Sequence, residues 1–175
     1  MNLQPTLEND TILLAPLEIN DFEALYQIAS DPLVWEQHPN KNRYQKEVFQ
    51  SFFEGAIASK GAFKIIDKKD QKIIGSTRFY NLDSKNNSVL IGYTFYGRAY
   101  WGSQYNPQVK NLMLNHAFKY VENVLFHIGA MNIRSQKAIE RLGAVQTKIF
   151  NVAYHGESET LNFEYLIEKK NWESK

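Results

Sequence analysis

The fold is decided by five successive segments: VLIGYTF (89–95), YGRAYWGSQYN (96–106), PQVKNLMLNHAFKYV (107–121), VLFHI (124–128) and NIRSQKAIERLGA (132–144). Their residue patterns predict a strand, a turn, a helix, a short second strand and a second helix. A strand that leads into a helix N-terminus aims backbone amides at one place, and such a place can hold a phosphate. The second strand and its helix would form a cleft beside it.

The rest of the chain completes a sheet around this stretch. Short polar turns between apolar segments predict antiparallel neighbours. The expected strands are 11–16, 62–67, 72–80, 88–95, 124–128, about 145–153 and 160–168. The expected helices are about 21–30, 44–59, 107–121 and 134–142, the third with Asn106 as its cap and Pro107 at its first position. This order predicts an α+β (mixed α/β) domain around one twisted sheet.

Composition narrows the class of protein. The chain has 175 residues, 43% of them hydrophobic and 14% aromatic, so we expect a single folded domain over 1–175. A formal net charge of +1 is too balanced for a nucleic-acid binder. The absence of cysteine excludes disulfides and thiolate metal sites, and the four histidines are too scattered to suggest a metal site. No apolar run has membrane-spanning length and no signal peptide opens the chain, so we expect a cytoplasmic protein without a membrane partner.

This element order, with the motifs IGYTF (91–95), YWGSQYN (100–106), VKNLMLNHAF (109–118) and NIRSQKAIERLGA (132–144), resembles the GNAT superfamily of N-acetyltransferases. The branch it resembles is that of the ribosomal-protein N-terminal acetyltransferases (RimJ/RimL-like), and the resemblance covers nearly the whole chain. It implies a GNAT-like acyl-CoA N-acyltransferase fold, with about seven strands in a central twisted mixed sheet flanked by four helices and a splay between the fourth and fifth strands. It also implies transfer of an acetyl group from acetyl-CoA directly to a primary amine, without a metal.

In the family that the chain resembles, the turn after the fourth strand holds the pyrophosphate of coenzyme A. The family pattern is Gln or Arg, two residues, Gly, one residue, and then Gly or Ala. The matching residues here are Trp101, Gly102, Ser103, Gln104, Tyr105 and Asn106. Gln104 stands where the central glycine normally lets the backbone approach phosphate closely. Several outcomes stay open: Gly102 and Ser103 compensate and binding is retained, or the departure means weakened coenzyme binding, a shifted pocket or a lost activity.

The resemblance assigns further roles to the second helix of this stretch. Asn132 would hydrogen-bond the pantetheine arm, cap the helix, or do both. Arg134 and Lys137 would meet the phosphates of coenzyme A, or else form a solvated helix face. The hydroxyl of Ser135 would help to protonate the leaving thiolate, or else it is a first-turn residue that satisfies backbone groups.

The resemblance also places the reacting end of the cofactor. Backbone amides near Tyr93, Thr94 and Phe95 would polarise the thioester carbonyl and stabilise the developing oxyanion. Tyr93 is therefore expected, with Ser135, among the catalytic positions. The strand at 124–128 would splay away so that the pantetheine arm inserts as a pseudo-strand and satisfies the exposed edges.

The acceptor would lie against the loops at about 31–43 and 154–159. Candidate substrate-binding residues there are Trp35, Glu36, His38 and His155. Trp35 would shape the acceptor pocket or pack against the second helix. For a general base the titratable candidates are Glu36, His38, His127 and His155, and proton transfer through water would leave no mark in the sequence.

Two function classes stay open at this point. The first is an enzyme that acetylates a protein N-terminus or a small-molecule amine, so its partner is a peptide or small-molecule amine. The second is a non-catalytic relative that binds coenzyme A or a protein partner, and Gln104 favours this reading. A homodimer is the assembly that base rates suggest.

Overall fold

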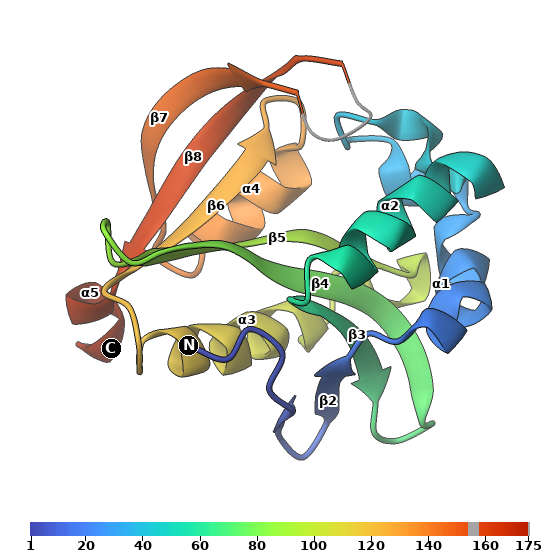
Figure 1. Cartoon of the computed structure of the whole chain (residues 1–175), viewed down its shortest axis with the longest axis horizontal. Coiled ribbons are helices and arrows are strands. Elements are labelled where there is room, and N and C mark those ends of the chain that lie inside the picture. The colour runs from blue at the N-terminus through green and yellow to red at the C-terminus, as the bar shows by residue number, and fades with distance from the viewer. Residues whose placement is uncertain (154–157, 175) are drawn as a thin grey trace.

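One mixed sheet forms the centre of the computed structural model, which describes residues 1–153 and 158–174 (Figure 1). Within these residues eight strands hydrogen-bond in the order β1-β2-β3-β4-β5-β6-β8-β7. They are β1 (Leu7–Glu8), β2 (Ile12–Pro16), β3 (Ala62–Asp67), β4 (Lys72–Asp83), β5 (Ser88–Tyr96), β6 (Asn123–Gly129), β7 (Val145–Val152) and β8 (Thr160–Glu168). The β5–β6 pair is parallel, while the other neighbouring strands run antiparallel.

Helices cover both faces of this sheet. They are α1 (Phe22–Ala29), α2 (Lys46–Ala58), α3 (Tyr105–Ala117), α4 (Ile133–Glu140) and the short α5 (Lys169–Glu173). Buried side chains of α1 and α2 form one apolar cluster with Ala62 and Phe95 of the sheet. Buried side chains of α3 and α4 join the larger cluster formed by the strands. The central sheet therefore has an apolar core on each face.

Short 3₁₀ turns complete the connections. They lie at Ile19–Asp21, Pro32–Trp35, Lys41–Tyr44 and Arg98–Tyr100. Two of them build the loop between α1 and α2, where the side chains of Asp31 and Asn40 each accept a hydrogen bond from a backbone amide two residues further on. This loop is therefore ordered by its own side chains.

The α+β class and the splay are confirmed, and three details of the prediction are wrong. The sheet has eight described strands instead of about seven, because the two-residue β1 is too short to show an alternating pattern. The described helices number five instead of four, because α5 has only five residues. The third helix begins at Tyr105, two residues earlier than predicted, since its first turn has no apolar periodicity.

The splay lies between β5 and β6. Their ladder joins Ser88 to Asn123, Val89 to Val124 and Leu90 to Leu125, and it ends there. Both strands continue, β5 alongside β4 and β6 alongside β8. Figure 1 shows β5 and β6 leaving a common end and diverging. The facing edges beyond the last pair are thus left without ladder bonds to each other, and buried backbone groups need partners.

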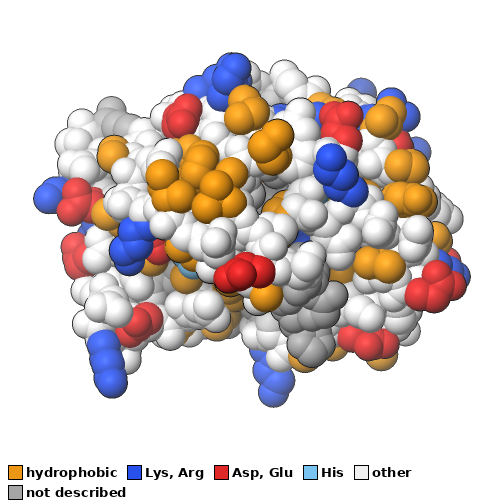
Figure 2. Space-filling model, turned by 90° about the horizontal axis from the view of Figure 1, so that it is seen from above, with side chains coloured by type: hydrophobic (Ala, Val, Ile, Leu, Met, Phe, Trp, Pro, Cys, Tyr) orange, Lys and Arg blue, Asp and Glu red, His pale blue; other side chains and the backbone are white. Residues whose placement is uncertain are grey.

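The surface carries both signs of charge. Figure 2 shows Lys and Arg side chains interspersed with Asp and Glu side chains on the face seen from above, together with a patch of hydrophobic side chains. On this face the two signs of charge are therefore mixed. Among the described residues, none of the helices is long and apolar enough to cross a membrane.

We predict that Phe49→Ala lowers the free energy of unfolding by about 3–5 kcal/mol. The side chain of Phe49 is 0% exposed, and its ring contacts the rings of Phe22, Tyr26, Phe53 and Phe95. Truncation would leave a cavity between α2 and the sheet. Urea denaturation of both proteins measures the difference.

The matched control is Ile19→Ala, at a side chain that is 73% exposed. Its removal should change the free energy of unfolding by less than about 0.5 kcal/mol. Equal effects of the two substitutions would contradict the packing described for α2.

Candidate active site

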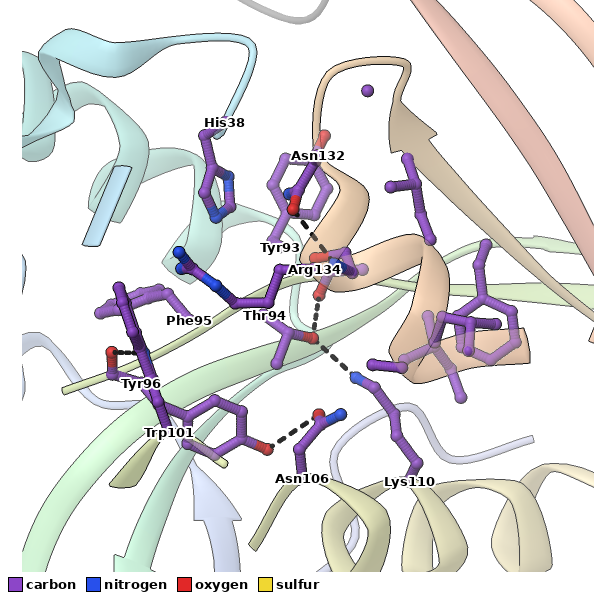
Figure 3. A pocket seen from close by; sticks show the side chains of 18 of the residues that line it. His38, Tyr93, Thr94, Phe95, Tyr96, Trp101, Asn106, Lys110, Asn132 and Arg134 are labelled. Carbon is purple, nitrogen blue, oxygen red and sulfur yellow. Dashed lines mark hydrogen bonds between the residues drawn. The ribbon is translucent and has the colours of Figure 1, made fainter. Parts of the chain in front are cut away.

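A cavity of about 550 Å³ opens where β5 and β6 separate (Figure 3). Its walls come from the α1–α2 loop, β5, the turn before α3, the first half of α3, β6 and α4. No Asp or Glu lines it among the described residues, whereas four cationic side chains do: Arg43, Lys110, Arg134 and Arg141. The cavity is therefore suited to an anionic ligand.

The turn before α3 forms one end of the cavity. Gly102 has a φ of +66°, which a residue with a side chain adopts only under strain. The backbone amides of Gly102, Ser103 and Gln104 donate to no acceptor in the described part of the chain, although those of Tyr100 and Trp101 do. Free amides next to the N-terminus of α3 make an anion site.

Gln104 does not strain this turn. Its φ is −80° and its ψ is 1°, a conformation open to any residue. The glycine that the family pattern expects here is therefore not needed for backbone conformation. Gln104 lines the cavity and directly precedes α3.

Asn106 is not the cap of α3, so this prediction is wrong. The helix begins at Tyr105, which makes Pro107 its third residue and leaves Gln104 in the cap position without a side-chain hydrogen bond. The side chain of Asn106 instead accepts a hydrogen bond of 3.3 Å from the hydroxyl of the buried Tyr96. This contact ties the start of α3 to the end of β5 (Figure 3).

The opposite end of the cavity is a bulge in β5. Ladder pairs join Ser76 to Phe95 and Arg78 to Gly92, so two residues of β5 stand opposite one residue of β4. One of the two, Tyr93, has a φ of +52°. A left-handed tyrosine is strained and needs support from its surroundings.

Arg78 provides part of this support. Its guanidinium carbon lies 4.1 Å from the centroid of the Tyr93 ring, and one of its terminal nitrogens donates to the carbonyl of Gly55 at 3.2 Å. Burial lowers the pKa of Arg78 to about 10, so the group is still charged at neutral pH. The cation and the ring hold the bulge from the α2 side of the sheet.

Asn132 caps α4, as predicted. Its side chain accepts a hydrogen bond of 3.2 Å from the backbone amide of Ser135, and it lines the cavity. The Ser135 side chain also lines the cavity, and in the described part of the chain its hydroxyl has no hydrogen-bond partner. Both polar groups are thus available at the end of the cavity that faces the bulge.

Arg134 bridges the mouth of the cavity. Its guanidinium carbon lies 3.8 Å from the centroid of the Trp101 ring, and its terminal nitrogen pairs with the carboxylate of Glu36. Its backbone amide donates to the side chain of Gln37 at 3.1 Å. The α1–α2 loop, α4 and the turn before α3 therefore meet at this arginine.

Two histidines line the cavity, and their surroundings differ in how they affect the pKa. Burial, and then the nearby charges of Arg43 and Arg134, lower the pKa of His38 to about 3. His38 is thus neutral at physiological pH and a poor proton acceptor. Burial also lowers the pKa of His127, but a hydrogen bond of 3.1 Å to Glu164 opposes this. Glu164 is held in turn by Thr147 at 2.9 Å, so the His127 ring is oriented.

The cavity brings together most of the predicted site residues. Lining it are Tyr93, Thr94, Phe95, Trp101, Gly102, Ser103, Gln104, Asn106, Asn132, Arg134, Ser135 and His38. Four others lie elsewhere: Tyr105 bonds Asp67, Lys137 is exposed on α4, Trp35 is fully buried in the α1–α2 core and Glu36 lies at the mouth. His155 lies outside the described residues.

The sequence analysis did not identify Lys110 as a cavity residue, and it did not decide which face of its strand His127 occupies. Lys110 shares the buried face of α3 with Val109, Met113, Leu114 and Ala117, and a lysine within such an apolar stripe is a readable signal. His127 alternates with buried Phe126 and Ile128 on β6, so its face could not be assigned before the pairing with β8 was known.

The residues present fit coenzyme A. The turn before α3 offers three amides without acceptors in the described part of the chain, and the edges of the diverging strands offer further backbone groups. Among the described residues, no group of three His, Asp or Glu side chains is arranged to hold a metal ion.

Comparison with known proteins agrees with this geometry. A family model described as "Acetyltransferase (GNAT) domain" matches residues 11–145. A curated relative, the uncharacterized N-acetyltransferase p20 from Bacillus licheniformis, is 25% identical over 119 residues. That match covers 65% of this chain and 66% of the relative, so the chain spans just under two thirds of the relative's length.

Solved structures share the fold. A GCN5-related N-acetyltransferase from Brucella melitensis superposes with a TM-score of 0.83 at 18% identity, covering 97% of this chain and 81% of that one. A spermidine N-acetyltransferase from Vibrio cholerae, in complex with CoA and spermine, gives a TM-score of 0.71 at 13% identity, covering 94% and 99%. Because the family model matches most of its length, the chain belongs to the GNAT acetyltransferase domain family.

Proposed function

We propose that the chain is an acetyl-CoA-dependent N-acetyltransferase that acts on a protein N-terminus or a small-molecule amine, within the RimJ/RimL-like branch and in the cytoplasm. One observation carries the proposal: a single cavity joins the amides before α3 to the bulge at the β5–β6 splay. A thioester that carries a pyrophosphate needs one group of residues for the pyrophosphate and another for the thioester, joined by one cavity. The absence of cysteine suits a reducing compartment.

Acetyl-CoA supplies the reaction with an acetyl thioester. The amides of Gly102, Ser103 and Gln104 would hold its pyrophosphate, each charge-assisted hydrogen bond contributing about 1.5–3 kcal/mol. The backbone at Tyr93, Thr94 and Phe95 would receive the thioester carbonyl. Asn132 would hydrogen-bond the arm between them.

His127 is the residue that we propose removes a proton from the acceptor amine. It lines the cavity on the strand that diverges from β5, and Glu164 orients its ring. Its pKa lies below the ordinary value, so the imidazole is neutral at pH 7 and can accept a proton. An N-terminal amine, with a pKa of about 7.7–8.0, needs only modest help.

The charge of the cavity supports an acceptor with a single amine. The charged side chains that line it are cationic among the described residues, and a polyamine would be repelled by them. A peptide N-terminus or an amino compound with an anionic or neutral body meets no such repulsion. We therefore rank these acceptors before spermine-like ones.

The non-catalytic alternative loses part of its support. It depended on Gln104 blocking the pyrophosphate turn, but the backbone at Gln104 is unstrained and the neighbouring amides remain without acceptors in the described chain. A decisive experiment incubates the purified protein with acetyl-CoA and a panel of peptides, amino acids and polyamines. Thiol release together with an acetylated amine detected by mass spectrometry supports the enzyme, whereas coenzyme binding without release from any acceptor supports the alternative.

We predict that Gly102→Ala raises the dissociation constant for coenzyme A about 5- to 30-fold, because a left-handed alanine costs about 1–2 kcal/mol. A Cβ at Gly102 would meet no atom within 4 Å, so the loss would come from the backbone and not from a clash. Titration calorimetry with coenzyme A measures it.

Gln104→Gly is the matched control in the same turn. Since the φ of Gln104 is −80°, glycine is not needed there and affinity should change less than about threefold. A large gain in affinity would mean that the Gln104 side chain obstructs the pyrophosphate.

We predict that His127→Gln lowers kcat/KM at pH 7 about 100-fold. The wild type should lose activity as the pH falls below about 6.5, through the pKa of His127, and the variant should not show this loss. At about pH 9 an N-terminal amine is mostly deprotonated by itself, so the defect should shrink. Initial rates between pH 5.5 and 9.5 test this with a peptide acceptor. An unchanged pH profile in the variant would exclude His127 as the base.

A further inference from the structure

Lys110 is a buried amino group that has no carboxylate partner among the described residues. Its side chain comes from the second turn of α3 and the residue is only 3% exposed. Its Nζ lies 2.7 Å from the hydroxyl of Thr94 and 3.4 Å from that of Thr77. The described residues give it no ion pair. Buried lysines are rare and normally paired, so this one needs an explanation.

Burying Lys110 without a charged partner lowers the stability of the folded protein. Burial, as the sole cause, lowers the pKa of Lys110 to about 7. Apolar residues could fill the same place on the α3 stripe without that cost. A strongly perturbed group that lines a cavity is a candidate functional residue.

The position of Nζ points to the thioester end of the cavity. Thr94 belongs to the bulge, next to the backbone that would receive the thioester carbonyl. Figure 3 shows the Lys110 side chain rising from α3 to Thr94, below the first turn of α4, which carries Asn132 and Arg134. The hydrogen bonds of Lys110 in the described chain go to Thr94 and Thr77 and not to the turn before α3.

The other titratable groups around the cavity do not supply the missing negative charge. Among the described residues that line the cavity, they are Arg43, His38, Tyr80, Tyr93, Tyr96, Tyr100, His127, Arg134 and Arg141. None of them is a carboxylic acid. An anion that complements Lys110 must therefore come with the ligand or form during the reaction.

We propose that Lys110 is a catalytic residue that stabilises and protonates the sulfur of departing coenzyme A, an inference that rests on the proposed acetyl transfer. The amine nitrogen bonds to the acetyl carbon, the carbon–sulfur bond breaks and its electron pair goes to sulfur. A proton passes from Nζ of Lys110 to sulfur, giving the thiol. The proton lost by the amine leaves through His127 to solvent, and solvent restores the proton of Lys110.

The test measures the bound coenzyme A thiol directly. The ultraviolet absorbance of thiolate is followed against pH for coenzyme A bound to the wild type, to Lys110→Met and to Lys110→Arg. A bound thiolate raises the pKa of Lys110 in turn, so the two groups titrate as a coupled pair, and the thiolate absorbance should appear about one pH unit or more lower in the wild type than in Lys110→Met. Lys110→Arg keeps the charge and should restore the low value, but it should not restore kcat, because guanidinium does not release its proton.

Lys119→Met is the control, since it removes an exposed lysine that directly follows the same helix. It should leave both the thiol pKa and kcat unchanged, whereas Lys110→Met should lower kcat at least tenfold. If the bound thiol has the same pKa in the wild type and in Lys110→Met, the inference is wrong, although the acetyltransferase assignment stands. Failure of the wild type to bind coenzyme A would instead overturn the assignment itself.

A binding comparison separates thiolate contact from phosphate contact. At a pH near the pKa of the bound thiol, Lys110→Met should bind coenzyme A more weakly than the wild type does. Its dissociation constant for desulfo-coenzyme A should stay within about twofold of the wild-type value. Equal weakening of both would make Lys110 a phosphate contact and overturn the inference.

The pH dependence of thermal stability shows whether the Lys110→Met variant folds normally. The folded pKa of Lys110 lies below its unfolded value of about 10.4, so the unfolded chain binds more protons between about pH 7 and 10.4 and wild-type stability gains a rising contribution there. Lys110→Met should melt at a higher temperature than wild type at pH 7 and should lack this contribution. A lower melting temperature would show that Lys110 acts as a structural residue.

Discussion

The site depends on one constraint: β5 and β6 hydrogen-bond only from Ser88 to Leu90 and then part. Each strand stays paired with its outer neighbour, while the inner edges beyond Leu90 and Leu125 face a cavity. Backbone groups with no strand beside them favour an extended ligand that can pair with them. Every residue assigned to the reaction lies along this opening.

The bulge in β5 shows how the opening is maintained. Tyr93 keeps a left-handed backbone conformation that is unfavourable alone, and it is supported by the guanidinium of Arg78 and by the ring of Tyr80, 5.0 Å away between centroids. Strain held by surrounding packing is a feature of functional sites. The strain here turns the backbone around Thr94 at the place where the strands diverge.

Cationic side chains lie both at the mouth of the cavity and in its interior. Arg134, stacked on Trp101, marks the mouth, and Lys110, bonded to Thr94, marks the interior. In the described part of the chain, two carboxylates that do not line the cavity pair with residues that do: Glu36 with Arg134 and Glu164 with His127. A cavity whose described lining has cationic but no acidic side chains favours a ligand that brings negative charge with it.

The sequence by itself determined the elements and the family. Alternating and helical apolar patterns located seven of the eight described strands and the four longer helices, because burial imposes periods of 2 and 3.6 residues on any chain of this fold. The motifs around Gly102 and Asn132 located the turn before α3 and the cap of α4. These features are local, so a window of sequence contains them.

Only the tertiary structure decided which side chains meet. Gln104 departs from the family pattern, yet its backbone proves to be unstrained. Trp35 packs in the core, which is one of the two roles that the sequence leaves open for it, and Lys110 lines the cavity although it lies on an apolar helix stripe. The pairing of His127 with Glu164 joins residues 37 positions apart. Such contacts depend on strand register and on the divergence of β5 and β6, and these are properties of the whole sheet that no single segment encodes.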